Sequence, residues 1–273
     1  MKDASGKTAL ITGASSGIGY ELAKCFAQDG HDVILVSRSQ SDLRAVADEL
    51  QAEHGITATP IAADLSKMGA AQALYDKVKQ LGVNVDYLVN DAGQGNYGKF
   101  WETDLEKDVA DIHLNVYSTV VLTKLFLKDM VARGEGKILQ LASMVSKTPA
   151  PFMAVYGGTK AFIYNFTLGL AEELEGTGVT VTALRPGATA TDFFHKAHAE
   201  EMEVVRKGKL GPADKVARDG YQALMSGRTA IVSGLQNKAM NAVGKVVPDP
   251  LMAKAGRKMH QPGREGSGKT ARH

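Results

Sequence analysis

Short, nearly continuous apolar runs alternate along this chain with longer stretches in which apolar residues recur at helical intervals. Residues 8–12 form the first run, and after a group of glycines residues 18–29 show helical spacing that stops at Gly30. The same unit recurs, and we predict strands at residues 8–12, 32–37, 57–62, 87–90, 137–141, 180–184 and 229–233. Helices are predicted at residues 18–29, 41–54, 68–81 and 154–174, with another long helical stretch that ends near Arg133.

The predicted strands are apolar throughout instead of alternating between apolar and polar residues. Strands that are covered by helices on both faces have this pattern. The sequence therefore predicts an α/β fold with a doubly wound parallel sheet of about seven strands flanked by helices. In such sheets ligands bind outside the carboxyl ends of the strands, so the residues that follow each run are the candidates for chemistry.

Composition narrows the class of protein. The chain has 273 residues, 44% of them hydrophobic, which is enough for one large domain with a sizeable core. Its single cysteine, Cys25, excludes a disulfide within the chain and a cysteine metal cluster, so we interpret it as a packing residue and predict no metal site. Residues 1–7 are polar and lack the apolar run of a signal peptide, and no stretch approaches the roughly 18 apolar residues of a membrane-spanning helix. We predict a cytoplasmic protein.

Charge is distributed unevenly along the chain. The net charge is +2, but residues 235–273 hold eight Lys or Arg against Asp249 and Glu265, a net of +6 that leaves −4 for residues 1–234. The larger part therefore has no basic stripe that would favour nucleic acid as a partner.

Glycines mark the turn after the first strand. Gly13, Gly17 and Gly19 follow the spacing Gly-x-x-x-Gly-x-Gly between that strand and the first helix. Such a turn lets the backbone approach a pyrophosphate, whose charge meets free N–H groups and the helix dipole. A glycine cluster alone could be a plain turn, but its place between strand and helix favours a dinucleotide loop of the Rossmann type.

Tyr156 and Lys160 are four residues apart in a predicted helix, so their side chains leave the same face. An ammonium beside a phenol favours the ionised form and lowers the pKa of the tyrosine from about 10, so we expect proton exchange near neutral pH. By itself the pair could equally be an exposed tyrosine with a solvated lysine. Ser143 lies thirteen residues before Tyr156 at the end of a strand, and Asn115 lies inside a helix, where asparagine is a poor helix former.

With these motifs the chain resembles a short-chain dehydrogenase/reductase from about residue 7 to residue 234. The resemblance implies that Asn115, Ser143, Tyr156 and Lys160 are catalytic, with Asn115 holding a water that links Lys160 to solvent. It implies cofactor contacts from the glycine turn, from several strand ends, from the catalytic helix and from the turn after the sixth strand: Gly13, Ser15, Ser16, Gly17, Ile18, Gly19, Arg38, Asp64, Leu65, Asn90, Ala92, Gly93, Tyr156, Lys160, Pro186, Gly187, Thr189 and Thr191.

Two of these positions, Arg38 and Asp64, and the neighbouring Asp91 need further comment. Arg38 stands where members that use NAD carry an acidic residue, so we predict NADP(H) over NAD(H), since a guanidinium can pair with a 2′-phosphate. Asp64 could hold the adenine amino group or cap the next helix with Ser66. Asp91 replaces the second asparagine of the family's Asn-Asn-Ala-Gly motif, which puts one structural hydrogen bond in doubt but not the chemistry.

The sequence specifies the substrate site less closely than the catalytic and cofactor positions. Residues 191–212 are a variable lid in the family, and we expect an apolar substrate pocket from this region and from other loops: Phe193, Phe194, Met202, Phe152, Met153, Tyr97 and Trp101. His195 and His198 are interpreted as lid residues and not metal ligands.

Beyond residue 234 we predict a basic helical extension over residues 235–260, followed by a disordered tail at 261–273. The extension could dock on the fold or on a second subunit, or, as the less favoured alternative, contact an anionic membrane surface. From the family resemblance we expect a homodimer or homotetramer.

The predicted function is NADP(H)-dependent hydride transfer between the nicotinamide and the carbonyl or alcohol carbon of an apolar ketone, aldehyde or secondary alcohol. A non-catalytic protein that senses NADPH or scaffolds a partner is the alternative from another class. An epimerase or dehydratase with the same Tyr and Lys is less favoured, because only about 80 residues follow Pro186.

Overall fold

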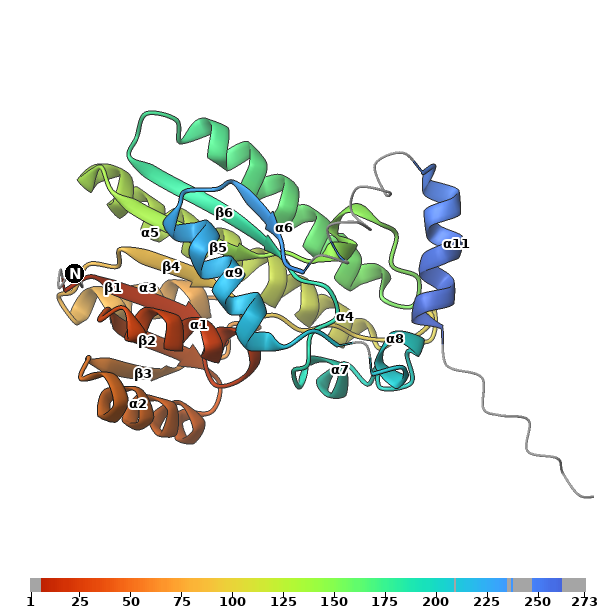
Figure 1. The fold of residues 1–273 in the computed structure, drawn as a ribbon, viewed down its shortest axis with the longest axis horizontal. Helices are drawn as coiled ribbons and strands as arrows, with labels where there is room; N and C mark the ends of the chain where they lie inside the picture. Colours follow the sequence, from red (N-terminus) through yellow and green to blue (C-terminus); the bar gives the residue numbers. More distant parts are fainter. Residues whose placement is uncertain (1–5, 209, 235–236, 238–246, 262–273) are drawn as a thin grey trace, which may run out of the picture.

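A single parallel sheet of seven strands forms the centre of the molecule (Figure 1). The structure is a computed structural model, and it describes residues 6–208, 210–234, 237 and 247–261. The strand order is β3-β2-β1-β4-β5-β6-β7, so the sheet is doubly wound, as the sequence predicted. The strands are β1 (Thr8–Thr12), β2 (Asp32–Ser37), β3 (Ala58–Ala62), β4 (Tyr87–Asn90), β5 (Gly136–Leu141), β6 (Val179–Arg185) and β7 (Ala230–Val232).

Helices cover both faces of the sheet. On one face, Ile11 and Leu35 pack against α1 (Gly17–Gln28), α2 (Gln40–His54) and α9 (Ala213–Met225). On the other, Leu10 and Ile34 pack against α3 (Ala70–Gln80), α5 (Thr119–Arg133) and α6 (Ala154–Glu173). Both faces of each central strand are therefore buried, which explains why the strand sequences are apolar throughout. Cys25 packs against the first of these cores, and burial raises the pKa of its thiol to about 11.

The long helix predicted to end near Arg133 is interrupted. It consists of α4 (Leu105–Ile112), a π-helical segment (His113–Ser118) and α5. Asn115 lies in the π-helical segment, so the residue that the sequence marked as a poor helix former is where the regular helix gives way. Single π-helical turns of this kind are frequent at functional sites.

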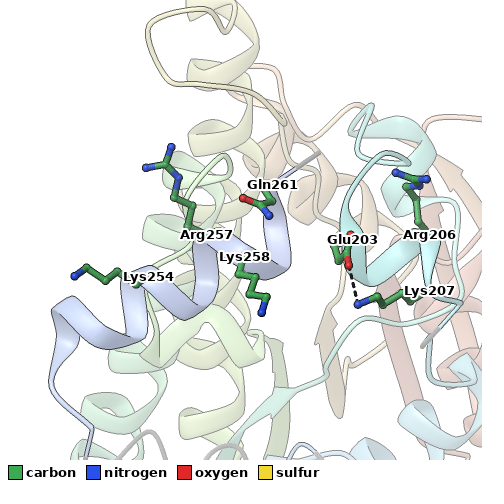
Figure 2. Close-up of a pocket in the computed structure, with 7 residues that line it drawn as sticks. All are labelled: Glu203, Arg206, Lys207, Lys254, Arg257, Lys258 and Gln261. Carbon is green, nitrogen blue, oxygen red and sulfur yellow. Dashed lines mark ion pairs between the residues drawn. The ribbon is translucent and has the colours of Figure 1, made fainter. Parts of the chain in front are cut away.

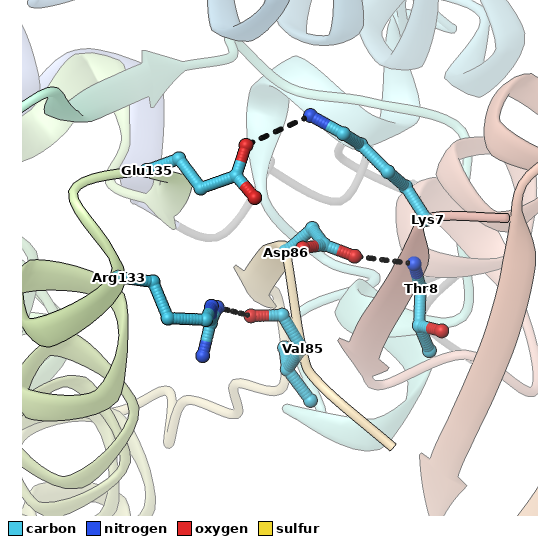
Figure 3. Close-up of polar contacts among 6 residues, drawn as sticks. All are labelled: Lys7, Thr8, Val85, Asp86, Arg133 and Glu135. Atoms are coloured by element: carbon cyan, nitrogen blue, oxygen red, sulfur yellow. Dashed lines mark hydrogen bonds and ion pairs between the residues drawn. The ribbon is translucent and has the colours of Figure 1, made fainter. Parts of the chain in front are cut away.

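Polar contacts hold the amino ends of the central strands together (Figure 3). The Asp86 carboxylate accepts a hydrogen bond from the Thr8 backbone N–H at 2.8 Å, and the Arg133 guanidinium donates to the Val85 carbonyl at 2.8 Å. Lys7 and Glu135 form an exposed ion pair at 3.3 Å. These contacts join β1, β4 and β5 at the end of the sheet opposite the predicted site.

Short helices and the described part of the extension lie beyond the carboxyl ends of the strands (Figure 1). They are α7 (Phe193–Lys196), α8 (Glu203–Arg206) and α11 (Asp249–His260). The Tyr97 hydroxyl donates to the His260 carbonyl at 2.7 Å, and a Cβ on Gly256 would lie 2.8 Å from the Pro149 carbonyl oxygen. The end of α11 is therefore packed closely on two loops of the domain.

Parts of the predicted extension and tail fall outside the described residues, namely 235–236, 238–246 and 262–273. Where the chain is described, no helix combines the length and the apolar character needed to cross a membrane. The cytoplasmic location stays a prediction from the sequence.

Candidate active site

A cavity of about 1400 Å³ runs along the carboxyl ends of the strands, from the glycine turn to α7 and α8. Most of the predicted site residues line it: Gly13, Ser15, Ser16, Gly17, Ile18, Arg38, Asp64, Leu65, Ala92, Gly93, Ser143, Tyr156, Pro186, Gly187, Thr189 and Thr191. The other four, Gly19, Asn90, Asn115 and Lys160, are not among the residues that line it. The structure therefore brings together residues from six separate turns, as expected for the carboxyl edge of a doubly wound sheet.

The glycine turn is too tight for side chains. Gly13 and Gly17 have φ of +74° and +61°, which favour glycine, and a Cβ on Gly19 would lie 2.5 Å from the Gly13 carbonyl oxygen. Ser16 makes no side-chain cap on α1, so its hydroxyl does not occupy the first N–H groups of that helix. A turn with exposed backbone donors at a helix start fits a diphosphate group.

Arg38 and Asp64 follow the neighbouring strands β2 and β3 and line the same cavity. Arg38 is exposed at the end of β2 and lines the cavity. The Asp64 carboxylate accepts hydrogen bonds from the Ser66 N–H at 3.1 Å and the Ser66 hydroxyl at 2.6 Å. Burial opposes ionisation, but these bonds and the charges of Lys67 and Arg38 hold the pKa of Asp64 below its usual value. Asp64 thus caps the turn at Ser66, and α3 starts only at Ala70.

The predicted catalytic pair leaves the same side of α6. Lys160 places its Nζ 5.8 Å from the centroid of the Tyr156 ring and donates a hydrogen bond to the Leu141 carbonyl at 2.8 Å. Ser143 follows β5, and its hydroxyl forms a hydrogen bond with the Tyr156 phenol. The buried Arg185 donates to the Ser143 carbonyl at 3.3 Å, a support that the sequence did not reveal.

The expected ionisation of Tyr156 is wrong for this structure. Burial raises the pKa of Tyr156 to about 12, the hydrogen bond with Ser143 offsets part of the shift, and the carboxylates of Asp91 and Asp111 add to it. Lys160 does not lower it, because its ammonium is directed at the Leu141 carbonyl and burial lowers its own pKa to about 8. Tyr156 is therefore a neutral phenol at neutral pH, the form that can donate a proton.

Asn115 connects α6 to the loop that follows β4. Its amide group donates to the Gln94 carbonyl at 2.8 Å and to the Thr159 hydroxyl at 3.0 Å, while its oxygen accepts from the Gln94 N–H at 3.0 Å. Thr159 in turn donates to the Tyr156 carbonyl at 2.8 Å. The Asn115 side chain thus positions the helix that carries Tyr156. Its proposed part in holding a water stays a prediction.

Asn90 and Asp91 form contacts that support the site. Asn90 donates to Thr123 and Gln140, both at 3.1 Å, and is not among the residues that line the cavity, so its cofactor contact stays a prediction. Asp91 is buried and accepts a hydrogen bond from the Gly19 N–H. Burial raises the pKa of Asp91 to about 7, although the charge of Lys160 and that hydrogen bond oppose the shift. Asp91 acts electrostatically on both Lys160 and Tyr156, a role that the sequence interpretation missed although the departure from the family motif pointed to this position.

The turn after β6 lines the cavity and comes close to the glycine turn, since a Cβ on Gly17 would lie 3.0 Å from the Thr191 side chain. The Pro186 carbonyl accepts from the Met144 N–H at 2.9 Å, and Thr189 donates to the Gly187 carbonyl at 3.0 Å. A Cβ on Gly187 would lie 2.5 Å from the Asn237 side chain. The Thr191 hydroxyl accepts from the Phe193 N–H at 3.3 Å, so this residue contacts the first turn of α7.

An apolar wall lies beside Tyr156. Phe193 places its ring centroid 5.0 Å from that of Tyr156, and Phe194, Met153 and Met202 also line the cavity. Three residues predicted for this wall do not line it: Tyr97, Phe152 and Trp101. Trp101 is 79% exposed, because it lies on a surface turn before α4, and Tyr97 and Phe152 pack against one another with ring centroids 6.1 Å apart.

The lid histidines lie in different surroundings. The exposed His195 contacts Glu200 at 2.6 Å, and His198 lines the cavity. Among the described residues, no group of three or more His, Cys, Asp or Glu side chains could hold a metal ion.

Comparison with known proteins identifies the family. The model of the short chain dehydrogenase family matches residues 7–202. A ketoacyl reductase of Nostoc, HetN, is 34% identical over 253 residues, which are 91% of this chain and 88% of the relative. A short chain dehydrogenase of Pseudocercospora fijiensis is 38% identical over 190 residues, which are 69% of this chain and only 61% of that relative.

Solved structures agree with the sequence comparison. A short-chain dehydrogenase from Sphingobium yanoikuyae in complex with NADPH has a TM-score of 0.77 and 29% identity, covering 89% of this chain and 96% of the other. A family member from Burkholderia phymatum in complex with NAD has a TM-score of 0.79 and 26% identity, covering 89% and 94%. The chain belongs to the short-chain dehydrogenase/reductase family of oxidoreductases.

Proposed function

We propose that the protein is an NADP(H)-dependent oxidoreductase that transfers hydride between the nicotinamide and the carbonyl or alcohol carbon of a ketone, aldehyde or secondary alcohol with an apolar body. One observation carries this proposal. Ser143 and the neutral Tyr156 line the same cavity as the glycine turn, so a proton donor and a dinucleotide site face one space.

The chain's own residues supply proton transfer and orientation. A bound nicotinamide supplies the hydride. Tyr156 donates its phenolic proton to the substrate oxygen as general acid, and Ser143 donates a second hydrogen bond that stabilises the charge on that oxygen. The wall formed by Phe193, Phe194 and Met153 excludes water from the reacting carbon. In the reverse direction Tyr156 accepts the proton.

Lys160 and Asn115 support the role of Tyr156 as proton donor. Lys160 lies against Gly93, since a Cβ there would be 3.2 Å from its Nζ, and that Nζ lies 5.8 Å from the centroid of the Tyr156 ring. From this position its ammonium supplies, through water, the proton that replaces the one that Tyr156 donates. Asn115 keeps Tyr156 in place through Thr159.

The preference for NADP(H) rests on Arg38. Its guanidinium lines the cavity at the end of β2, where it can pair with a 2′-phosphate. Asp42 and Asp64 line the same region, and the hydrogen bonds from Ser66 already engage the Asp64 carboxylate.

The first test is the loss of turnover in Tyr156→Phe. Oxidation of NADPH is followed by absorbance across a panel of ketones and aldehydes, and the variant should retain no more than a few per cent of the activity, because phenylalanine has no proton to donate. NADPH binding, followed by fluorescence titration, should be unchanged within about twofold, since the substitution removes one hydroxyl and leaves the glycine turn and Arg38 intact. A variant with substantial activity would refute the assignment. If the wild-type protein binds NADPH but turns over no carbonyl compound or alcohol, the non-catalytic sensor is favoured.

The second test separates the cofactors. Arg38→Gln should raise the KM for NADPH about tenfold or more, because one charge-assisted phosphate contact is lost, and should leave the KM for NADH nearly unchanged. Arg44→Gln, an exposed arginine on α2, is the control and should change neither value. Equal effects of Arg38→Gln on the two cofactors would contradict the predicted preference.

We further propose that a second copy of the chain covers an apolar row on α4. Leu105, Val109 and Ile112 follow one another at helical spacing and are all exposed, as are Phe100 and Trp101 just before the helix. A contiguous apolar row of this kind is typical of a protein interface.

A further inference from the structure

A basic cleft separates α8 from the end of α11 (Figure 2). It has a volume of about 700 Å³. Figure 2 shows Glu203 on α8 and Lys207 just after it turned toward the side of Lys258 and Gln261, whereas Lys254 and Arg257 point away from α8. The residues that line the cleft are Glu203, Arg206, Lys207, Lys254, Arg257, Lys258 and Gln261.

Positive charge in this basic cleft exceeds what its own carboxylate can balance. Lys207 pairs with Glu203 at 2.7 Å, and among the described residues none of the other four cations forms an ion pair with a carboxylate. Hydrogen bonding and charge from Lys207 lower the pKa of Glu203, with further contributions from Arg206 and Lys258. Five cations and a single acid therefore line the cleft, a formal net charge of +4.

The basic cleft opens onto the cavity that holds Tyr156. Glu203, Lys207 and Lys258 line both spaces, and Met259 and His260 at the end of α11 line the cavity. His260 is buried, and its ring contacts the Pro151 carbonyl at 3.2 Å, while its own carbonyl accepts from Tyr97. α11 thus holds its cations at a fixed place beside the mouth of the cavity.

We propose that the basic cleft binds a phosphate-bearing group of the substrate while the apolar part that carries the carbonyl lies in the cavity against Phe193 and Tyr156. This inference rests on the proposed function. Two guanidinium groups and several ammonium groups suit a group with more than one negative charge, and guanidinium groups pair bidentately with phosphate. A carboxylate would leave most of these cations unpaired.

A lipid headgroup has the same chemistry but fits the position less well. The basic cleft is concave and continuous with an internal cavity, whereas a membrane surface needs large apolar anchors beside the cations. On the described part of α11 the exposed large hydrophobic residues are Leu251 and Met259, and Met259 lines the cavity.

The test begins with direct binding of an anion. Tripolyphosphate is titrated by calorimetry into the protein saturated with NADPH, so that Arg38 is already engaged. We compare the wild type with the double variant Arg206→Gln and Arg257→Gln, which removes one exposed cation from each helix. The matched control, Lys128→Gln with Arg228→Gln, removes the same charge elsewhere on the surface. The affinity should fall about tenfold or more in the cleft variant and less than twofold in the control.

The second arm uses two substrates with the same 3-oxoacyl group, one on coenzyme A and one on N-acetylcysteamine, which has no phosphate. The cleft variant should raise the KM of the first about tenfold and leave kcat and the KM of the second unchanged. Equal KM values of the wild type for the two thioesters, or equal tripolyphosphate affinity in the wild type and the cleft variant, would overturn the proposal. Sedimentation with phosphatidylglycerol vesicles that depends on Arg206 and Arg257 would assign the basic cleft to a membrane and also overturn it. Should no carbonyl compound be turned over, the proposed function fails, and the tripolyphosphate titration still decides whether the basic cleft binds phosphate.

Discussion

Asp91 shows how one side chain can link the cofactor turn to the catalytic pair. It accepts a hydrogen bond from the Gly19 N–H, lies near Gly13 and acts on the charge of Lys160. A Cβ on Gly13 would lie 2.8 Å from its Oδ2, so the glycine turn packs directly on the carboxyl group. One of its oxygens, Oδ1, has no hydrogen-bond partner among the described residues. An ionised Asp91 is therefore only partly compensated.

The raised pKa of Asp91 predicts a pH-dependent effect of Asp91→Asn on stability. The folded protein holds this proton up to about pH 7, whereas the unfolded chain releases it near 3.8. The stability that this group contributes is therefore complete below pH 4 and is lost as the pH rises through 7. Asparagine keeps the acceptor for the Gly19 N–H and has no proton to lose. The difference in melting temperature, variant minus wild type, should therefore increase from pH 5 to pH 8.

Thermal unfolding at several pH values with the same ionic strength measures this gain. The other titrating groups contribute equally to the stability of the variant and of the wild type, so their contributions cancel in the difference. The pH dependence of that difference therefore reports on position 91. Asp48→Asn, at an exposed position on α2, should show no such trend. If the melting temperatures of Asp91→Asn and the wild type differ by the same amount at every pH from 5 to 8, the raised pKa of Asp91 is contradicted.

At the scale of elements, the strands could be predicted because their residues are apolar throughout, as expected for strands that are buried on both faces. The predicted bounds of β1, β2 and β4 coincide with the observed ones, and the other strands differ by one residue at either end. α3 begins at Ala70, two residues later than predicted, because Gly69 takes a left-handed conformation with φ of +78° at the start of the helix. Local rules of this kind depend only on neighbours in the sequence.

Contacts between distant segments could not be predicted in the same way. Asn115 was found as a poor helix former, but its bonds to Gln94 and Thr159 depend on how α6 packs on the π-helical segment. Trp101 looked like a pocket residue because aromatic side chains often line pockets, yet its turn lies on the surface. The pKa of Tyr156 was expected to be lowered because the four-residue spacing alone was taken to place the Lys160 ammonium beside the phenol. Burial and the direction of the Lys160 amine reverse the result.

Across the whole molecule, the two ends of the sheet have different roles. Hydrogen bonds from Thr8 and Arg133 and the Lys7–Glu135 ion pair join the strands at the amino end. The carboxyl end carries the cavity and the basic cleft, where charges remain available to ligands. Stabilising contacts and chemistry are thus separated by the length of the strands, so substitutions at the amino end should affect stability without altering the site.

The proposed second copy makes a prediction that concerns the assembled molecule. Val109 is 43% exposed in the middle of the apolar row on α4, so Val109→Glu would place a charge inside the proposed interface while leaving the folded subunit intact. Light scattering after gel filtration should show a dimer or tetramer for the wild type and a shift toward monomer for the variant. Val83→Glu is the matched control, because Val83 is 40% exposed in the loop before β4 and should not change the oligomeric state. A monomeric wild type, or the same mass for both variants, would show that a second copy does not cover this row. Because α4 leads directly into the segment that carries Asn115, a loss of the dimer that also lowers kcat would further show that assembly supports the position of Tyr156.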